Sequence, residues 1–116
     1  MNGMEIQRRI LSLATEDFYG LWEIPSVVRD VFPQLNERDA MDLAKRVLRE
    51  LIDRHLIRVY LGTRFVGEER ALAREESESA LADAKNWTVE SSSEGENVRI
   101  AATEMGDREY YKFTQH

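Results

Sequence analysis

The chain has 116 residues, of which 42% are hydrophobic and 33% charged, a composition typical of one modest globular domain. It contains no cysteine, which excludes a disulfide framework, a thiolate metal site and a cysteine nucleophile. No stretch approaches the ~20 apolar residues of a membrane span, and the N-terminal segment lacks the apolar run of a signal peptide. We therefore expect a cytoplasmic protein without a membrane partner.

The net charge of −6 is unevenly distributed along the chain. Residues 1–65 contain ten basic and ten acidic side chains, whereas residues 66–116 contain six basic and twelve acidic ones. The overall charge argues against a nucleic-acid partner, because Lys and Arg supply most of the non-specific affinity for DNA. Within residues 45–65, however, six basic side chains accompany only two acidic ones, which indicates either a local basic patch or an ordinary solvated face.

Apolar residues at helical spacing predict a first helix over about residues 4–16 and a second, of about two turns, over residues 24–32. A third helix is expected over residues 37–54, with Asn36 as its N-cap. The apolar side chains of this helix share one face, so its charged side chains cover the opposite face. The basic residues that we expect on that outer face are Arg38, Lys45, Arg46 and Arg49. Asp42 interrupts this stripe, either as an acceptor for a cytosine amino group or as a partner in a helical salt bridge.

After the third helix, His55 is expected to adopt a positive φ, and the hydrophobic period then changes from 3.6 residues to 2. The new period predicts a strand that begins at Ile57 and exposes Arg58 and Arg64. These two arginines suit contacts with DNA phosphates, although an ordinary half-exposed strand has the same pattern. The succession of short helix, turn, long helix and strand resembles a winged helix-turn-helix domain. That resemblance implies DNA binding, and it implies a brief strand at residues 21–23 with Trp22 in the core.

The second wing strand is expected only at residues 97–103, so the wing contains an insertion of about residues 66–97. Residues 67–85 are rich in strong helix formers and predict a helix of four or five turns. A few apolar side chains are expected to pack against the domain or a partner: Leu72, Ala73, Ala80, Leu81, Ala84 and Trp87. The carboxylates are expected to face solvent rather than bind a metal: Glu68, Glu69, Glu75, Glu76, Glu78 and Asp83. A polar loop is expected to follow at residues 90–96.

Residues 98–111 are similar to the wing strand and the start of the last helix in MarR-like and PadR-like winged-helix regulators. The matching residues are Thr103, Glu104, Met105 and Gly106, which resemble the T-E-x-G turn of those families. Two departures limit the comparison. The sequence stops at His116, so the long dimerisation helix of those regulators is expected to be missing or reduced to about two turns, and the wing carries the acidic insertion.

Nothing in the sequence matches a catalytic spacing such as G-x-S-x-G, H-E-x-x-H or a Gly-rich phosphate loop, so we expect no enzyme, no cofactor and no metal. We expect a single α+β domain, residues 1–116, of the winged helix-turn-helix type, with a three-helix core, a small antiparallel sheet and a helical insertion in the wing. The expected function is binding of double-stranded DNA as a transcriptional regulator, through Arg38, Lys45, Arg46, Arg49, Arg58 and Arg64. The alternative is a winged-helix protein-interaction module, whose acidic insertion or third helix contacts another protein or a second copy of the chain.

Overall fold

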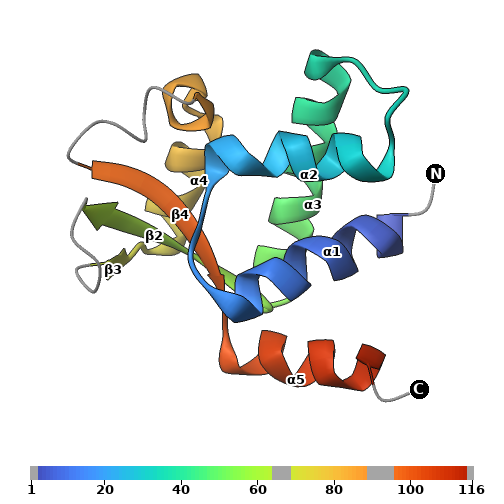
Figure 1. The fold of residues 1–116 in the computed structure, drawn as a ribbon. Coiled ribbons are helices and arrows are strands. Elements are labelled where there is room, and N and C mark those ends of the chain that lie inside the picture. The colour runs from blue at the N-terminus through green and yellow to red at the C-terminus, as the bar shows by residue number, and fades with distance from the viewer. Residues whose placement is uncertain (1–2, 64–68, 89–95, 115–116) are drawn as a thin grey trace.

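The computed structural model describes residues 3–63, 69–88 and 96–114, and within them the chain is an α+β protein (Figure 1). The helices are α1 (Gly3–Glu16), α2 (Ile24–Val31), α3 (Glu37–Asp53), α4 (Arg74–Ala82) and α5 (Glu104–Thr114). The strands are β1 (Tyr19–Gly20), β2 (Ile57–Thr63), β3 (Arg70–Ala71) and β4 (Glu96–Ala102). Two short 3-10 helices, η1 (Leu21–Glu23) and η2 (Ala84–Trp87), precede α2 and follow α4.

The four described strands form one antiparallel sheet in the order β1-β4-β2-β3. β2 pairs with β4 from Ile57 opposite Ala102 to Thr63 opposite Glu96, so the strands on either side of the insertion are direct neighbours. β1 lies along the other edge of β4, and β3 lies along the other edge of β2. The predicted small antiparallel sheet is therefore present, with an insertion between β2 and β4.

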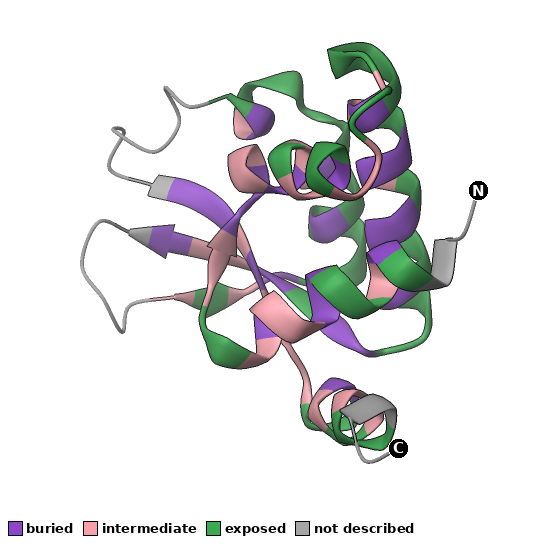
Figure 2. Ribbon diagram, turned by 45° about the vertical axis from the view of Figure 1, so that its right-hand side comes forward, coloured by how far each residue is buried: buried purple, intermediate pink, exposed green. Residues whose placement is uncertain are grey.

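One hydrophobic core joins the helices to the sheet. Its fully buried members include Ile6 and Ile10 of α1, Leu48 and Leu51 of α3, and Ile100 of β4. Figure 2 shows buried residues gathered on the inner sides of these elements, with exposed residues on their outer sides. Each such side chain contributes roughly 1.5–3 kcal/mol by leaving water, so the alternation of apolar and polar positions fixes which side of α3 faces outward.

α3 begins and ends at the residues that the sequence predicts. The Asn36 side chain accepts a hydrogen bond from the backbone N–H of Asp39 at 2.8 Å, which caps the N-terminus. His55 has a φ of 61°, and the N–H groups of His55 and Leu56 donate to the carbonyls of Ile52 and Leu51, both at 2.9 Å. This pair of hydrogen bonds is the Schellman motif, which ends the helix, and the chain continues directly into β2.

The insertion differs from the single long helix that its composition predicts. Its first part pairs with the edge of β2 as β3, and the Leu72 N–H continues this pairing by donating to the Val59 carbonyl at 2.9 Å. α4 starts only after Ala73, and Asp83, with an extended backbone, ends it before η2. Helix propensity is a weak preference, and strand pairing with β2 overrides it at the N-terminal end of the predicted helix. At the C-terminal end, the Asp83 side chain accepts from the Lys85 N–H at 3.0 Å and caps η2.

The first strand is also displaced from its predicted position. β1 precedes residues 21–23, which form η1, and the Glu23 carboxylate accepts from the Gly20 N–H at 2.9 Å. Trp22 is half-buried rather than a core residue, and its ring lies where a Cβ on residue 20 would be, within 1.8 Å. Glycine at this position is therefore required by the aromatic ring above it.

α5 is joined to the α3–β2 turn by hydrogen bonds. The Thr103 N–H donates to the Leu56 carbonyl at 3.0 Å, and the Thr103 hydroxyl donates to the His55 carbonyl while accepting from the Gly106 N–H. A Cβ at residue 106 would lie 1.9 Å from the Leu56 carbonyl oxygen, so the turn requires glycine there. α5 has eleven residues, or about three turns, rather than the predicted two, and it packs against α1.

Candidate nucleic-acid interface

The outer face of α3 presents three of the four predicted arginine and lysine side chains. Arg38, Arg46 and Arg49 are exposed, and none of them makes a hydrogen bond or ion pair within the described part of the chain. Arg38 and Arg49 are eleven residues apart, which places them roughly 16 Å apart along the axis and within about 20° of each other around it. Their guanidinium groups therefore share one face and keep all their donors for a partner.

Acidic side chains occupy the same face. Asp39, Asp42 and Asp53 are exposed there, so the outer face carries three negative charges beside the three arginines. Glu50 is exposed too, but its carboxylate accepts from the Gln7 side chain of α1 at 2.7 Å. Asp42 lies four residues from both Arg38 and Arg46, one helical turn in each direction. The outer face of α3 is thus a mixed-charge surface, and any anion bound there is held by individual arginines rather than by a broad positive field.

Lys45 lies on the same outer face of α3 as Arg38 and Arg49, seven and four residues away, and the insertion packs against it there. Its side chain is half-buried, and its Nζ is 5.8 Å from the centroid of the Trp87 ring, a cation–π distance. Trp87 is itself buried and donates its ring N–H to the Leu81 carbonyl at 2.9 Å. The insertion therefore covers the outer face of α3 at Lys45, which has less freedom to reach a ligand than the exposed Arg46 or Arg49.

The sequence predicts two arginines on the strand that follows α3, and one of them, Arg58, is among the described residues. Arg58 is exposed on β2 and makes no hydrogen bond or ion pair with the described residues. It lines a cavity between β2 and the start of α4, together with Arg74. Arg64 lies outside the described residues.

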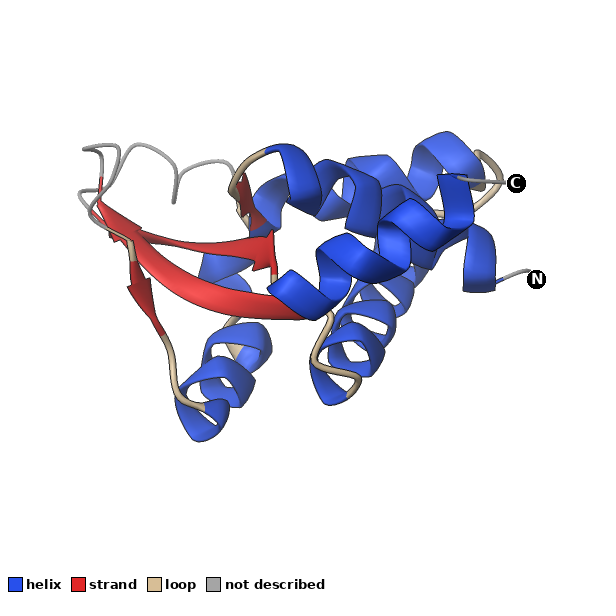
Figure 3. Cartoon of the chain, turned by 90° about the horizontal axis from the view of Figure 1, so that it is seen from below, coloured by secondary structure: helices blue, strands red, loops and turns tan. Residues whose placement is uncertain are grey.

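A groove separates α3 from α4, and we call it the α3–α4 groove. Figure 3 shows the two helices side by side, both projecting from the same side of the sheet. The groove consists of two adjoining cavities of about 290 and 90 Å³. Its floor is apolar and is formed by Ile52, Val59, Leu72 and Leu81. Its rim carries the charged side chains of Arg49, Asp53, Arg58, Arg74 and Glu78.

Arg74 extends across this groove from α4 to α3. Its Nη2 lies 3.2 Å from Asp53 Oδ1, and its Nε lies 4.0 Å from Glu78 Oε1. The Arg74 side chain is 72% exposed, so each ion pair is screened by water and contributes about 0–1 kcal/mol. These contacts orient the guanidinium without removing it from solvent. No local sequence pattern marks Arg74 as a site residue, because its place in the groove depends on how α4 folds back beside α3.

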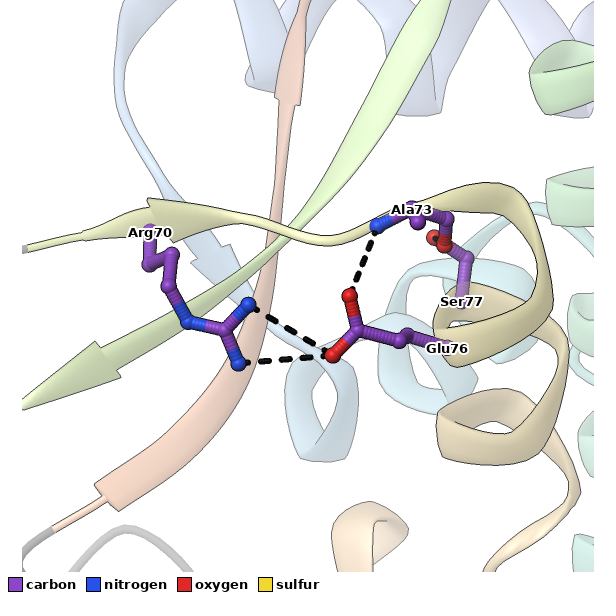
Figure 4. A network of polar contacts seen from close by, with 4 residues as sticks. All are labelled: Arg70, Ala73, Glu76 and Ser77. Carbon is purple, nitrogen blue, oxygen red and sulfur yellow. Dashed lines mark hydrogen bonds and ion pairs between the residues drawn. The ribbon is translucent and has the colours of Figure 1, made fainter.

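The N-terminus of α4 is held by Glu76 (Figure 4). The Glu76 carboxylate accepts from the Ala73 N–H at 3.1 Å and from the Arg70 guanidinium at 3.4 Å. The hydrogen bond from the Ala73 N–H, followed by that from Arg70, lowers the pKa of the Glu76 carboxyl below 4.5. Ala73 has no side-chain acceptor to return the bond, so Glu76 supplies one half of a capping box.

A buried ion pair fastens the start of the insertion to β4. Arg99 Nη1 lies 3.0 Å from Glu69 Oε1, and the Glu69 side chain is only 6% exposed. Arg99 also donates from Nε to the Asn97 side chain at 2.6 Å. The prediction that Glu69 faces solvent is therefore wrong, because the start of β3 brings it beside a strand thirty residues away. No local sequence signal marks this pairing.

The described residues include no helix long and apolar enough to cross a membrane. They also include no group of three or more histidine, aspartate or glutamate side chains arranged to hold a metal ion. Neither a protein-family model, nor a curated protein, nor a solved structure matches the chain.

Proposed function

We propose that the chain is a winged helix-turn-helix protein. Its element order of α1, β1, α2, α3, β2 and β4, and the sheet order β1-β4-β2 within it, support this assignment. β2 and β4 are then the two wing strands, and β3, α4 and η2 form an insertion between them. The Schellman turn at His55, which leads the long helix straight into a wing strand, also supports it.

We propose further that α3 binds double-stranded DNA and that the protein acts as a transcriptional regulator in the cytoplasm. The observation that carries this proposal is the set of exposed arginines without partners on α3 and β2: Arg38, Arg46, Arg49 and Arg58. Arginine can donate to guanine O6 and N7 or to phosphate oxygens. The insertion contacts α3 at Lys45, the middle residue of the helix, and at Asp53, its last residue, so the N-terminal half with Arg38 stays exposed. The N-terminal half is the part that helix-turn-helix proteins insert into the major groove.

The salt dependence of duplex binding tests this proposal. Three or four arginine–phosphate contacts give a slope of log K against log salt of roughly −3. We expect Arg46→Ala and Arg49→Ala each to weaken binding and to flatten the slope by about 0.9, measured by fluorescence anisotropy with a labelled duplex. Arg108→Ala on α5, where Arg108 pairs with Glu104 and not with α3 or α4, is the control of equal charge. Absence of duplex binding at low salt by a folded chain would contradict the proposal.

A second candidate is a winged-helix module that binds a basic surface, either on another protein or on a second copy of this chain. It is favoured by the acidic groups on the outer face of α3 and by the exposed carboxylates of α4, Glu75, Glu76 and Glu78. Asp42→Asn separates the two candidates. DNA binding predicts that this variant binds a duplex more tightly, since a charge that repels phosphate is removed. Protein binding predicts that neither the native chain nor the variant binds a duplex.

A further inference from the structure

We propose that the phosphate backbone of the bound duplex crosses the α3–α4 groove, where Arg74 of the insertion holds it together with Arg49 and Arg58. This inference rests on the proposed DNA-binding function and adds a residue and a path to it. The acidic insertion then extends the DNA interface instead of merely interrupting the wing.

The position of Arg74 is the first observation behind this inference. It lines both cavities of the groove, whereas Arg49 lines one of them from α3 and Arg58 lines the other from β2. Three guanidinium groups from three different elements therefore surround one groove. Arg74 lies between the other two and links the α3 arginines to the wing strand.

The charge of the groove is the second observation. Its rim has three arginines and two carboxylates, Asp53 and Glu78, so it is locally positive on a chain whose net charge is −6. A phosphodiester backbone complements this arrangement, because guanidinium groups bind phosphate oxygens through paired N–H donors. The apolar floor supplies no competing anion.

The ion pairs of Arg74 leave it able to bind a phosphate. Asp53 is bonded to Nη2, and Glu78 is 4.0 Å from Nε, so Nη1 and the remaining Nη2 proton are available as donors. The side chain is 72% exposed, so its donors face water that a phosphate can replace. Asp53 and Glu78 act here as positioning residues that hold the guanidinium over the groove.

Arg74→Ala tests the inference, with Arg108→Ala as a matched control. Both arginines are 72% exposed and both pair with an exposed carboxylate, but Arg108 lies on α5. With a labelled duplex, we expect Arg74→Ala to weaken binding about eightfold at 0.1 M salt and to flatten the salt slope by about 0.9, the loss of one phosphate contact. Arg108→Ala should stay within about twofold of the native chain. Arg74→Lys, which keeps the charge, should retain the native slope.

Two outcomes overturn the inference while leaving the proposed function intact. One is that Arg74→Ala behaves like Arg108→Ala although Arg46→Ala still weakens binding. The other is that Arg74→Ala weakens binding without changing the salt slope, which would indicate an effect on structure rather than a lost phosphate contact. If the native chain binds no duplex at low salt, the proposed function itself fails, and a groove of this charge would then serve an acidic protein segment.

Discussion

At the scale of single residues, Thr103 and Gly106 connect the ends of two helices. The Thr103 side chain and backbone bond to the carbonyls of His55 and Leu56, where α3 has just ended, and the Thr103 hydroxyl also accepts from the first turn of α5. Gly106 lets the α5 backbone approach the Leu56 carbonyl closely. Thr103 and Gly106 of the T-E-x-G sequence therefore make the contacts that join the start of α5 to the turn after α3.

We expect Gly106→Ala to lower the free energy of unfolding by about 1–3 kcal/mol, because a Cβ 1.9 Å from the Leu56 oxygen forces the helix away from the turn. Urea denaturation followed by circular dichroism measures the change. Met105→Ala in the same turn is the control, since its side chain is half exposed and its loss should change stability by less than about 0.5 kcal/mol. Equal stability of the two variants would show that the turn can relax.

Single residues of the candidate site differ in how well the sequence predicts their positions. Arg38, Arg46 and Arg49 lie opposite the buried stripe of α3, so the helical period alone places them outside. The period places Lys45 on the same face, but its partial burial depends on Trp87, more than forty residues later. The burial of Glu69 likewise depends on a distant strand. Local periodicity contains no information about such partners.

Among the elements, α4 depends on a single carboxylate for its N-terminal cap. The folded-state pKa of Glu76 is lowered, so the ionised cap contributes stability above pH 4.5, and that contribution is lost as the pH falls through the folded pKa. We expect Glu76→Gln to be less stable than the native chain at pH 7. The difference should shrink as the pH is lowered below 4.5, measured by urea unfolding at several pH values.

Glu75→Gln is the control for this prediction. It removes the same charge from the same helical turn, but Glu75 accepts no hydrogen bond from the described residues. The stability difference between native and variant should therefore vary less with pH for Glu75→Gln than for Glu76→Gln. Identical pH profiles for the two variants would show that the hydrogen bonds of Glu76 contribute nothing beyond its charge.

The elements also differ in how far the sequence determines them. α3 is predictable at both ends because Asn36 and His55 supply local capping signals around a long periodic stretch. β1 and β3 have two residues each, which is too short for any period. They form because an edge of β4 and an edge of β2 are available for pairing. Short strands of this kind are consequences of the tertiary structure and not causes of it.

For the whole molecule, the insertion shares the hydrophobic core. Leu72, Leu81 and Trp87 are buried in the same cluster as the residues of α1 and α3. The insertion is therefore expected to unfold together with the rest of the chain, as one domain of residues 1–116. Trp87 in η2 reports on the insertion, and Trp22 in η1, which contacts η2, reports on the side of the domain where the insertion packs.

We expect Trp22→Phe and Trp87→Phe variants, each with one remaining tryptophan, to show fluorescence transitions that coincide with their own far-UV circular dichroism transitions in urea. Coincident transitions are the mark of two-state unfolding. An earlier fluorescence transition for the variant that retains Trp87 would show that the insertion unfolds separately. That result would contradict the single-domain expectation.

The pairing of β2 with β4 across the insertion has a consequence for the kinetics of folding. Residues 64–95 separate the two strands, whereas a hairpin loop usually has two to five residues. A loop about eight times longer raises the entropic cost of closure by about 2 kcal/mol. β3 reduces this cost, because it pairs with β2 much closer in sequence. We expect the β2–β3 contacts to form before the β2–β4 contacts, so the insertion that separates β2 from β4 also supplies the intermediate step by which the two strands come together.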